Sequence, residues 1–280
     1  MKFANCWRKL LTEPWCITPL MHRTMTDILV QHMRGEKPAA FFMLDDSEET
    51  APAMILDDGV AIIPVKGVIS KDVSKMEKMS GAIDVREIGE MIDAALSDPR
   101  TTAIVLNVDS PGGSITGVPE LAAKVAEANK SKPVFAYTDG MMASAAYWIS
   151  AGASAIYAAG SAVVGSIGCY LALLDESRAY ELAGYRTEVI KAKGSPMKAA
   201  GLPGTSLTDE QRIELQEGVD HVYGQFRDFV LQSRAVPDEA MRGGTYFGTE
   251  CGPTGLIDSI STLENCVNDA RDYATKRMKK

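Results

Sequence analysis

The feature of the sequence that most constrains the fold is a regular alternation of two kinds of segment over residues 59–151. The segments "GVAIIPVKGVIS", "TAIVLNVDS" and "PVFAYTDG" are apolar and β-branched, as buried strands are. Each is followed by a segment with helical spacing, most clearly "IDVREIGEMIDAALSDP", where Ile83, Ile88, Ile92 and Leu96 form one apolar stripe. This alternation predicts right-handed βαβ units, a mainly parallel sheet and the α/β class.

Residues 140–174 carry no charged side chain, and the stretch is longer than the roughly 20 residues that a membrane-spanning helix needs. Its apolar character is nevertheless diluted by Ala, Ser and Tyr, and four glycines interrupt it. We therefore expect a short helix over 143–153 and two buried strands, over 155–160 and 161–175, rather than a membrane span.

Composition excludes further classes of function. The 280 residues are 46% hydrophobic, which allows a sizeable core, and the net charge is −8. We expect no nucleic-acid partner, because there is no basic surplus to displace counterions. The cysteines form no CxxC pair and do not cluster with histidine, so we expect free thiols in a reducing compartment and no metal site. They are Cys6, Cys16, Cys169, Cys251 and Cys266.

We interpret residues 1–50 as an N-terminal appendage to a domain over residues 51–280. Helical spacing in "TMTDILVQHMRG" predicts a short helix, and "DDSEET" predicts an acidic linker. Charges and prolines interrupt "CWRKLLTEPWCITPLMHR", so it lacks the apolar core of a signal peptide, and we expect a cytoplasmic protein. Beyond the uncharged stretch we expect a strand over 185–192, a Gly/Pro-rich loop over 193–206, and a long amphipathic helix capped by Thr208.

Two unusual sequences stand where predicted strands end and helices begin, which is where sites form in parallel sheets. The first is "DSPGGS", residues 109–114. Pro111 fixes φ, while Gly112 and Gly113 can present bare N–H groups in a tight turn. Two such amides facing one point would form an oxyanion hole or an anion-binding nest. The alternative is a plain turn that needs positive φ.

The second sequence is "DGMMAS", residues 139–144. Ser144 follows a strand and begins a helix, so its hydroxyl lies near free amides and the positive end of the helix dipole. Ala143, Ala145 and Ala146 leave room for another backbone to approach. The competing interpretation is a helix cap or a small core serine.

A nucleophilic serine needs a base. No histidine is well placed to serve Ser144, which disfavours a Ser-His-Asp triad; the three are His22, His32 and His221. A lysine could act instead if desolvation leaves it neutral. The candidates in the loop after the uncharged stretch are Lys191, Lys193 and Lys198, each of which could equally be a solvated loop lysine.

Four motifs carry a family resemblance over about residues 59–270. They are "VLNVDSPGGSITG", "TDGMMASAAYWISAGASAIYAAGSAVVGSIG", "MKAAGLPGTSLTDEQR" and "GTECGPTGLIDSI". In order and approximate spacing they resemble the signal peptide peptidase A (SppA-like) serine peptidases. The resemblance implies a ClpP/crotonase-like fold built from repeated β-β-α units, and a Ser-Lys dyad that needs no cofactor or metal.

The family's functional residues fall on positions of this chain. The resemblance implies Ser144 as nucleophile and Lys198 as base, with Lys191 and Lys193 as the other candidates. It implies an oxyanion hole made by the amides of Gly113 and Ala145. Ser110, Pro111 and Gly112 would form the turn that supports it.

The N-terminal "EPWCITPLMHRTMTDIL" resembles the opening of the phage and prophage branch, whose members process capsid or scaffold proteins. That branch implies an endopeptidase acting on polypeptides. In double-length family members serine and lysine come from different halves of one chain, so we expect a homo-oligomeric ring in which a neighbouring chain supplies the lysine.

Two features depart from the family pattern. Ser-Ala-Ala replaces the frequent Ser-Gly-Gly at the serine, which narrows access, and the sequence stops at Lys280 without the C-terminal scaffold extension of some phage relatives. Three other functions remain open: a cytosolic peptidase degrading peptides or signal peptides, a crotonase-like acyl-CoA enzyme, and a non-catalytic capsid-interaction protein.

Overall fold

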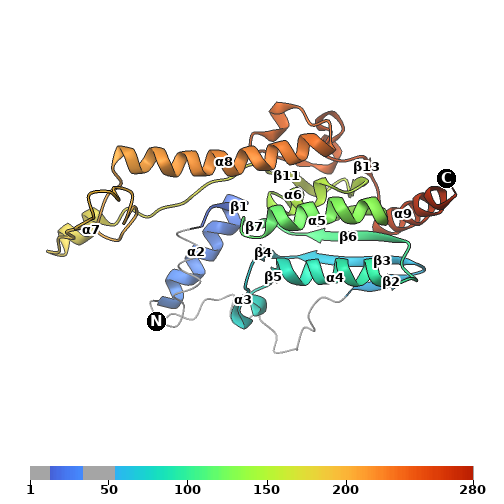
Figure 1. Cartoon of the computed structure of the whole chain (residues 1–280), viewed down its shortest axis with the longest axis horizontal. Coiled ribbons are helices and arrows are strands. Elements are labelled where there is room, and N and C mark those ends of the chain that lie inside the picture. Colours follow the sequence, from blue (N-terminus) through green and yellow to red (C-terminus); the bar gives the residue numbers. More distant parts are fainter. Residues whose placement is uncertain (1–12, 34–53, 280) are drawn as a thin grey trace.

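The computed structural model describes residues 13–33 and 54–279. The predicted acidic linker and Cys6 lie outside these residues, and the predicted boundary at residue 50 stays a prediction. Figure 1 shows a layered α/β body from which one long segment projects. We call this segment, residues 171–207, the arm. It contains one short helix, α7 (Ser177–Leu182).

The body is built from repeated units, each with a strand of the main sheet, a short second strand and a helix. The first is β3 (Val60–Lys66), β4 (Val68–Ser70) and α4 (Val85–Ser97), with α3 (Lys75–Met79) and β5 (Ala82–Asp84) inserted. The second is β6 (Ala103–Asp109), β7 (Gly112–Ser114) and α5 (Val118–Ser131). The third is β8 (Val134–Thr138), β9 (Met141–Ala143) and α6 (Ala145–Ala151). The predicted α/β class and β-β-α units are confirmed.

The main strands form one six-stranded sheet in the order β13-β10-β8-β6-β3-β2. It is parallel except for the edge strand β2 (Ile55–Asp57), and it includes β10 (Ala155–Ala158) and β13 (Ser259–Ile260). The short strands form two further sheets, β1-β7-β4-β5 and β12-β11-β9. Their remaining members are β1 (Trp15–Ile17), β11 (Val163–Gly165) and β12 (Thr245–Phe247). Strands β4, β7 and β9 directly follow the main strands β3, β6 and β8, so the short sheets lie at the carboxyl ends of these main strands.

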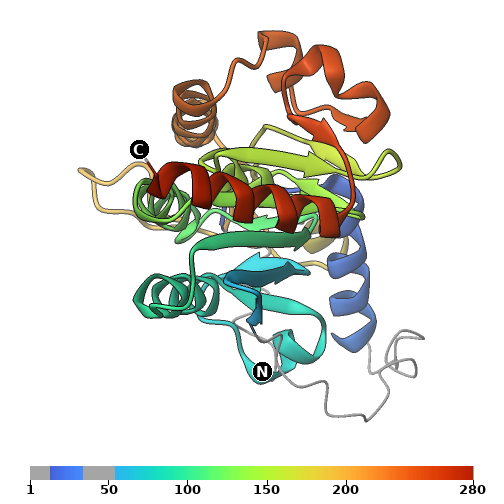
Figure 2. The same cartoon turned by 90° about the vertical axis from the view of Figure 1, so that its right-hand side faces the viewer.

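Helices cover both faces of the main sheet. Helices α4 and α5 pack side by side on one face, and α9 (Leu263–Met278) lies across the other, over β6 and β8 (Figure 2). Helix α2 (Pro19–Met33) follows β1, and α8 (Asp209–Ser233) runs over α6. The expected cap of α8 is present, because Thr208 and Gln211 bond each other's backbone as a capping box.

One strand prediction was wrong, and two were wrong in part. Residues 185–192 form no strand; they lie in the arm, where Ile190 is 93% exposed and no neighbouring strand is available. Of 161–175 only β11 is a strand, because Gly165 and Ser166 take positive φ and end it. The strand predicted over 59–70 divides into β3 and β4 at Gly67, whose φ is 81°. No helix within 13–33 and 54–279 has the length and apolarity to cross a membrane.

Helix α6 is held against α8 by an aromatic pair. The rings of Trp148 and Phe226 stack 4.5 Å apart at 4°, and both side chains are buried. We expect Phe226→Ala to lower the free energy of unfolding by about 3–5 kcal/mol, because it removes the ring and leaves a cavity. Urea denaturation measures the effect. Ile213→Ala on the same helix, where the side chain is 60% exposed, should change it by less than about 0.5 kcal/mol. Equal losses of unfolding free energy in the two variants would contradict the packing of Phe226 against Trp148.

Candidate active site

The two strand–helix junctions that the sequence singles out meet in space. The amide of Ser110 donates to the carbonyl of Met141 (2.7 Å), and the amide of Ala143 donates to the carbonyl of Ser110 (3.2 Å). The glycine turn is thereby tied to the strand that leads into Ser144. A Cβ placed on Gly112 would lie 2.9 Å from the Cβ of Ser144. The structure therefore brings the predicted turn and the predicted serine together.

Ser144 occupies a strained elbow between β9 and α6. It is the N-cap of α6 with φ 56° and ψ −120°, and it is 1% exposed. A non-glycine residue with this backbone costs free energy and persists only where its surroundings fix it. Its amide donates to the carbonyl of Gly165 (2.8 Å), and its carbonyl accepts from the amide of Trp148 (2.9 Å). A strained strand-to-helix turn is the backbone arrangement that exposes nucleophilic serines in unrelated hydrolases.

The two predicted oxyanion-hole residues flank this elbow. Ala145 is the first residue of α6, so its amide has no acceptor within the helix. Gly113 lies in β7, where a Cβ would come 1.8 Å from the carbonyl oxygen of Ile69 in β4. Glycine is therefore required at this position for close strand packing. Gly112 beside it has φ 100°, and its amide donates a hydrogen bond to the Ser110 hydroxyl oxygen (3.2 Å).

The surroundings of Ser144 come from β1 and from residues 166–170. The Ser144 hydroxyl lies 3.5 Å from the carbonyl oxygen of Gly168. Cys16 of β1 is fully buried beside it. A hydrogen bond with the Cys169 thiol, together with burial, raises the pKa of Cys16 well above its ordinary value, although its hydrogen bond with Ser144 acts in the opposite sense.

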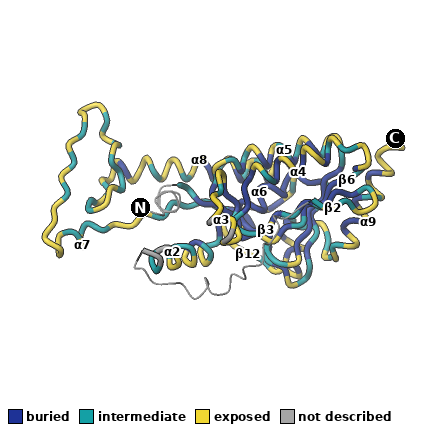
Figure 3. The backbone as a smooth tube through the Cα atoms, turned by 90° about the horizontal axis from the view of Figure 1, so that it is seen from below, coloured by how far each residue is buried: buried dark blue, intermediate teal, exposed yellow. Residues whose placement is uncertain are grey.

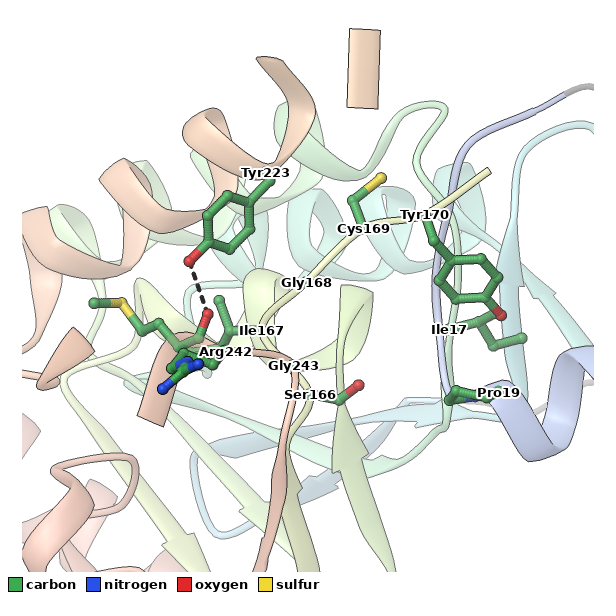
Figure 4. Close-up of a pocket in the computed structure, with 11 residues that line it drawn as sticks. Ile17, Pro19, Ser166, Ile167, Gly168, Cys169, Tyr170, Tyr223, Arg242 and Gly243 are labelled. Carbon is green, nitrogen blue, oxygen red and sulfur yellow. Dashed lines mark hydrogen bonds between the residues drawn. The ribbon is translucent and has the colours of Figure 1, made fainter. Parts of the chain in front are cut away.

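A cavity of about 320 Å³ continues from this region (Figure 4). Ile17 and Pro19 line it on the side of the N-terminal segment, beside Tyr170. On the opposite side lie Tyr223 of α8, which donates to the carbonyl of Met241 (2.8 Å), and Arg242. The cavity therefore lies between the N-terminal segment and α8, next to residues 166–170.

The structure does not bring the predicted lysine to Ser144 within one chain. Lys198 is exposed in the arm, which projects away from the body (Figures 1 and 3). Lys193 is also exposed, and the Lys191 ammonium donates to the carbonyl of Pro196 (3.0 Å), also in the arm.

The described histidine side chains lie away from the Ser144 hydroxyl's contacts. The His22 ring packs against Trp15 and Tyr170, and His221 lies on the exposed side of α8 next to Gln225. No group of three or more His, Cys, Asp or Glu side chains in the described ranges could hold a metal ion.

The sequence pattern did not predict the backbone conformation of Ser144 or the position of β1. The first had one sequence signal, the run of alanines at 143, 145 and 146, which permits a sharp turn close to other backbone. The second had none in the local pattern, because β1 pairs with a strand almost a hundred residues away.

An α/β body with a strained serine at a strand–helix elbow, beside a glycine turn, is the architecture of a serine hydrolase. The model of peptidase family S49 matches residues 126–277, more than half of the chain. The chain therefore belongs to peptidase family S49, a family of serine peptidases, and the predicted family resemblance is confirmed.

Relatives carry matching names. A putative protease of Methanocaldococcus jannaschii is 31% identical over 195 residues, 68% of this chain and 62% of that protein. The capsid assembly protease C of Escherichia phage lambda is 28% identical over 238 residues, 83% of this chain and 53% of that protein. The chloroplastic serine protease SPPA of Arabidopsis thaliana is 27% identical over 221 residues, 78% of this chain.

The chain spans only 32% to 62% of the length of these three relatives. Among solved structures, the enoyl-CoA hydratase EchA3 of Mycobacterium ulcerans Agy99 matches 81% of this chain and 84% of its own, with 18% identity and a TM-score of 0.45.

The backbone strain at Ser144 can be measured without activity. Ser144→Gly and Ser144→Ala both remove the hydroxyl, but only glycine relieves the strain. We expect the glycine variant to be more stable than the alanine variant by about 1 kcal/mol in urea denaturation. Ser150, buried within α6, is the control: there glycine should be less stable than alanine by about 1 kcal/mol. The same order at both positions would show that Ser144 is unstrained.

Proposed function

We propose that the protein is a serine endopeptidase whose nucleophile is Ser144. The observation that carries this proposal is the strained elbow, which holds a buried hydroxyl next to the glycine turn and 3.5 Å from the carbonyl oxygen of Gly168. Membership of the S49 family favours a peptidase over an acyl-CoA enzyme or a non-catalytic capsid-binding protein.

In the proposed mechanism a neutral lysine takes the proton of the Ser144 hydroxyl as its oxygen attacks the scissile carbonyl. The amides of Gly113 and Ala145 donate to the oxyanion of the tetrahedral intermediate. The lysine returns the proton to the leaving amine as the C–N bond breaks. Water then attacks the acyl-enzyme by the same route, and the acid product leaves Ser144 free.

We propose Lys198 as that base, supplied by a neighbouring chain. The arm that carries it exposes large apolar side chains that no part of its own chain covers: Leu174 (61% exposed), Leu182 (82%), Tyr185 (68%) and Ile190 (93%). A projecting apolar arm of this kind is typical of a segment that packs on another subunit. Because the arm and the Ser144 site are different surfaces, we propose a head-to-tail contact whose repetition closes as a ring.

We propose a polypeptide substrate, a capsid or scaffold protein of a phage or prophage, cleaved in the host cytoplasm or the procapsid. The similarity to capsid assembly protease C and to the head-tail preconnector protein GP5 of Enterobacteria phage P21 supports this choice. Similarity to proteases named SppA leaves a peptidase that degrades peptides or signal peptides as the second candidate.

A mixing experiment tests the shared site. The Ser144→Ala and Lys198→Ala variants should each hydrolyse peptides about 10³-fold or more slowly than the wild type, because each lacks one member of the dyad. After dissociation and co-assembly at equal amounts they should recover a substantial part of wild-type activity, since mixed rings contain intact Ser144–Lys198 pairs.

Lys193→Ala serves as the matched control, because Lys193 lies in the same arm and should keep wild-type activity. Mixed oligomers that form and stay inactive at every ratio would place the dyad within one chain. Full activity of Lys198→Ala with loss in Lys191→Ala would identify Lys191 as the base.

A further inference from the structure

Strand β1 lies where a peptide bound at Ser144 would lie. It pairs antiparallel with β7, with Cys16 opposite Gly113. On its other edge Trp15 exchanges two backbone hydrogen bonds with Tyr170, at 2.8 and 3.1 Å. A short strand added between two backbone edges is the way that peptides bind to many sheet-edged sites. Figure 4 shows Ile17 directly beside Tyr170 at this position.

The register of β1 brings the Cys16 carbonyl to the predicted oxyanion hole. The amide of Thr18 donates to the carbonyl of Pro111 (3.0 Å), and that of Ile115 to the carbonyl of Pro14 (3.4 Å). In an antiparallel ladder, hydrogen-bonded residue pairs alternate with non-bonded pairs. The pairs Thr18–Pro111 and Pro14–Ile115 are bonded, so the pair Cys16–Gly113, which lies midway between them, is bonded as well. The amide of Gly113 therefore faces the carbonyl of Cys16.

The neighbouring atoms agree with this register. The Cys16 carbonyl oxygen would be 2.2 Å from a Cβ on Gly112, and the Cβ of Ser144 would be 2.9 Å from the same point. The oxygen of Cys16 and the side chain of Ser144 therefore lie on the same side of the glycine turn. A substrate carbonyl attacked by Ser144 would occupy this place.

The side chains of β1 are held by a small cluster of their own. Trp15 and Ile17 are each 2% exposed and pack with Met21, Met25, Val68 and Tyr170, apart from the main core. The His22 ring lies 5.6 Å from the Trp15 ring and 5.5 Å from the Tyr170 ring. A three-residue strand with a few backbone bonds, each worth about 0.5–1.5 kcal/mol, can be displaced by a competing strand.

We propose that β1 is an internal ligand of the active-site channel, which blocks Ser144 until a substrate strand displaces it. This proposal rests on the proposed peptidase function. It also defines the substrate: an extended segment added antiparallel to β7, with a small side chain where Cys16 stands and bulky apolar side chains where Trp15 and Ile17 stand.

The first test compares rates of labelling of Ser144 by a fluorophosphonate probe in the full chain. Ile17→Asp places a carboxylate in the β1 cluster, and we expect it to be labelled about tenfold faster than the wild type, because the open state is a minority in the wild type. Leu20→Glu, on exposed α2 surface, should label at the wild-type rate. Equal rates for Ile17→Asp and wild type would overturn the block. No labelling of Ser144 in any variant would instead overturn the peptidase proposal.

The second test uses the wild-type sequence, so it does not depend on how a variant folds. The thiols of Cys16 and Cys169 lie close enough to shift each other's pKa, that of Cys16 upward and that of Cys169 downward. Oxidation with diamide should join them, as peptide mapping will show, and labelling of Ser144 should fall about tenfold and recover with reductant. Cys169→Ser should keep its labelling rate under diamide. Labelling unaffected by the Cys16–Cys169 disulfide would overturn the proposal.

Discussion

The strained backbone of Ser144 is the constraint on which the rest of the site depends. A φ of 56° with ψ −120° is not a conformation that serine adopts freely, so the surrounding fold must impose it. It does so from both ends of the turn. Strand β9 is fixed between β11 and the Ser110 turn, and α6 is fixed by the stacked rings of Trp148 and Phe226. The buried core thereby supplies the free energy that holds the hydroxyl in place.

The same connections explain why the glycine turn and the serine belong to one site although the two motifs begin 30 residues apart, at 109 and 139. Each β-β-α unit has a short strand after the carboxyl end of a main strand. Strands β4 and β7 pair in one sheet, and a bridge between Ser110 and Met142 joins the turn before β7 to β9. Segments that recur along the sequence, one in each unit, therefore lie close together in the folded chain. This cluster is where Gly113, Ala145 and Ser144 come together.

Much of this could be predicted from sequence, because the information is local. Apolar and β-branched runs with helical stripes between them determine the units, and the glycines at 112 and 113 mark a turn that no side chain could occupy. The strand expected over 185–192 failed because a β-branched run forms a strand only where a neighbour pairs with it, and the arm offers none. The docking of β1 could not be predicted, since its register depends on a distant edge that the sequence of β1 does not specify.

The proposed function places two requirements on activity that this single chain does not meet by itself. The proposed base, Lys198, lies on an arm that projects away from the body, and β1 occupies the proposed substrate channel. Under the proposal, other polypeptides meet both requirements: a neighbouring subunit supplies the lysine, and a substrate displaces β1 from the channel. A peptidase of this kind would be inactive until its subunits assemble and an extended segment of a substrate binds.

A crystal structure of the protein treated with a peptide boronate that carries alanine next to boron tests the central claim most directly. We predict boron bonded to the Ser144 hydroxyl oxygen and a boronate oxygen within hydrogen-bonding distance of the Gly113 and Ala145 amides. The peptide should run antiparallel to β7 in the place of β1. Boron bonded to another residue, or a peptide bound elsewhere with β1 still paired to β7, would contradict the account.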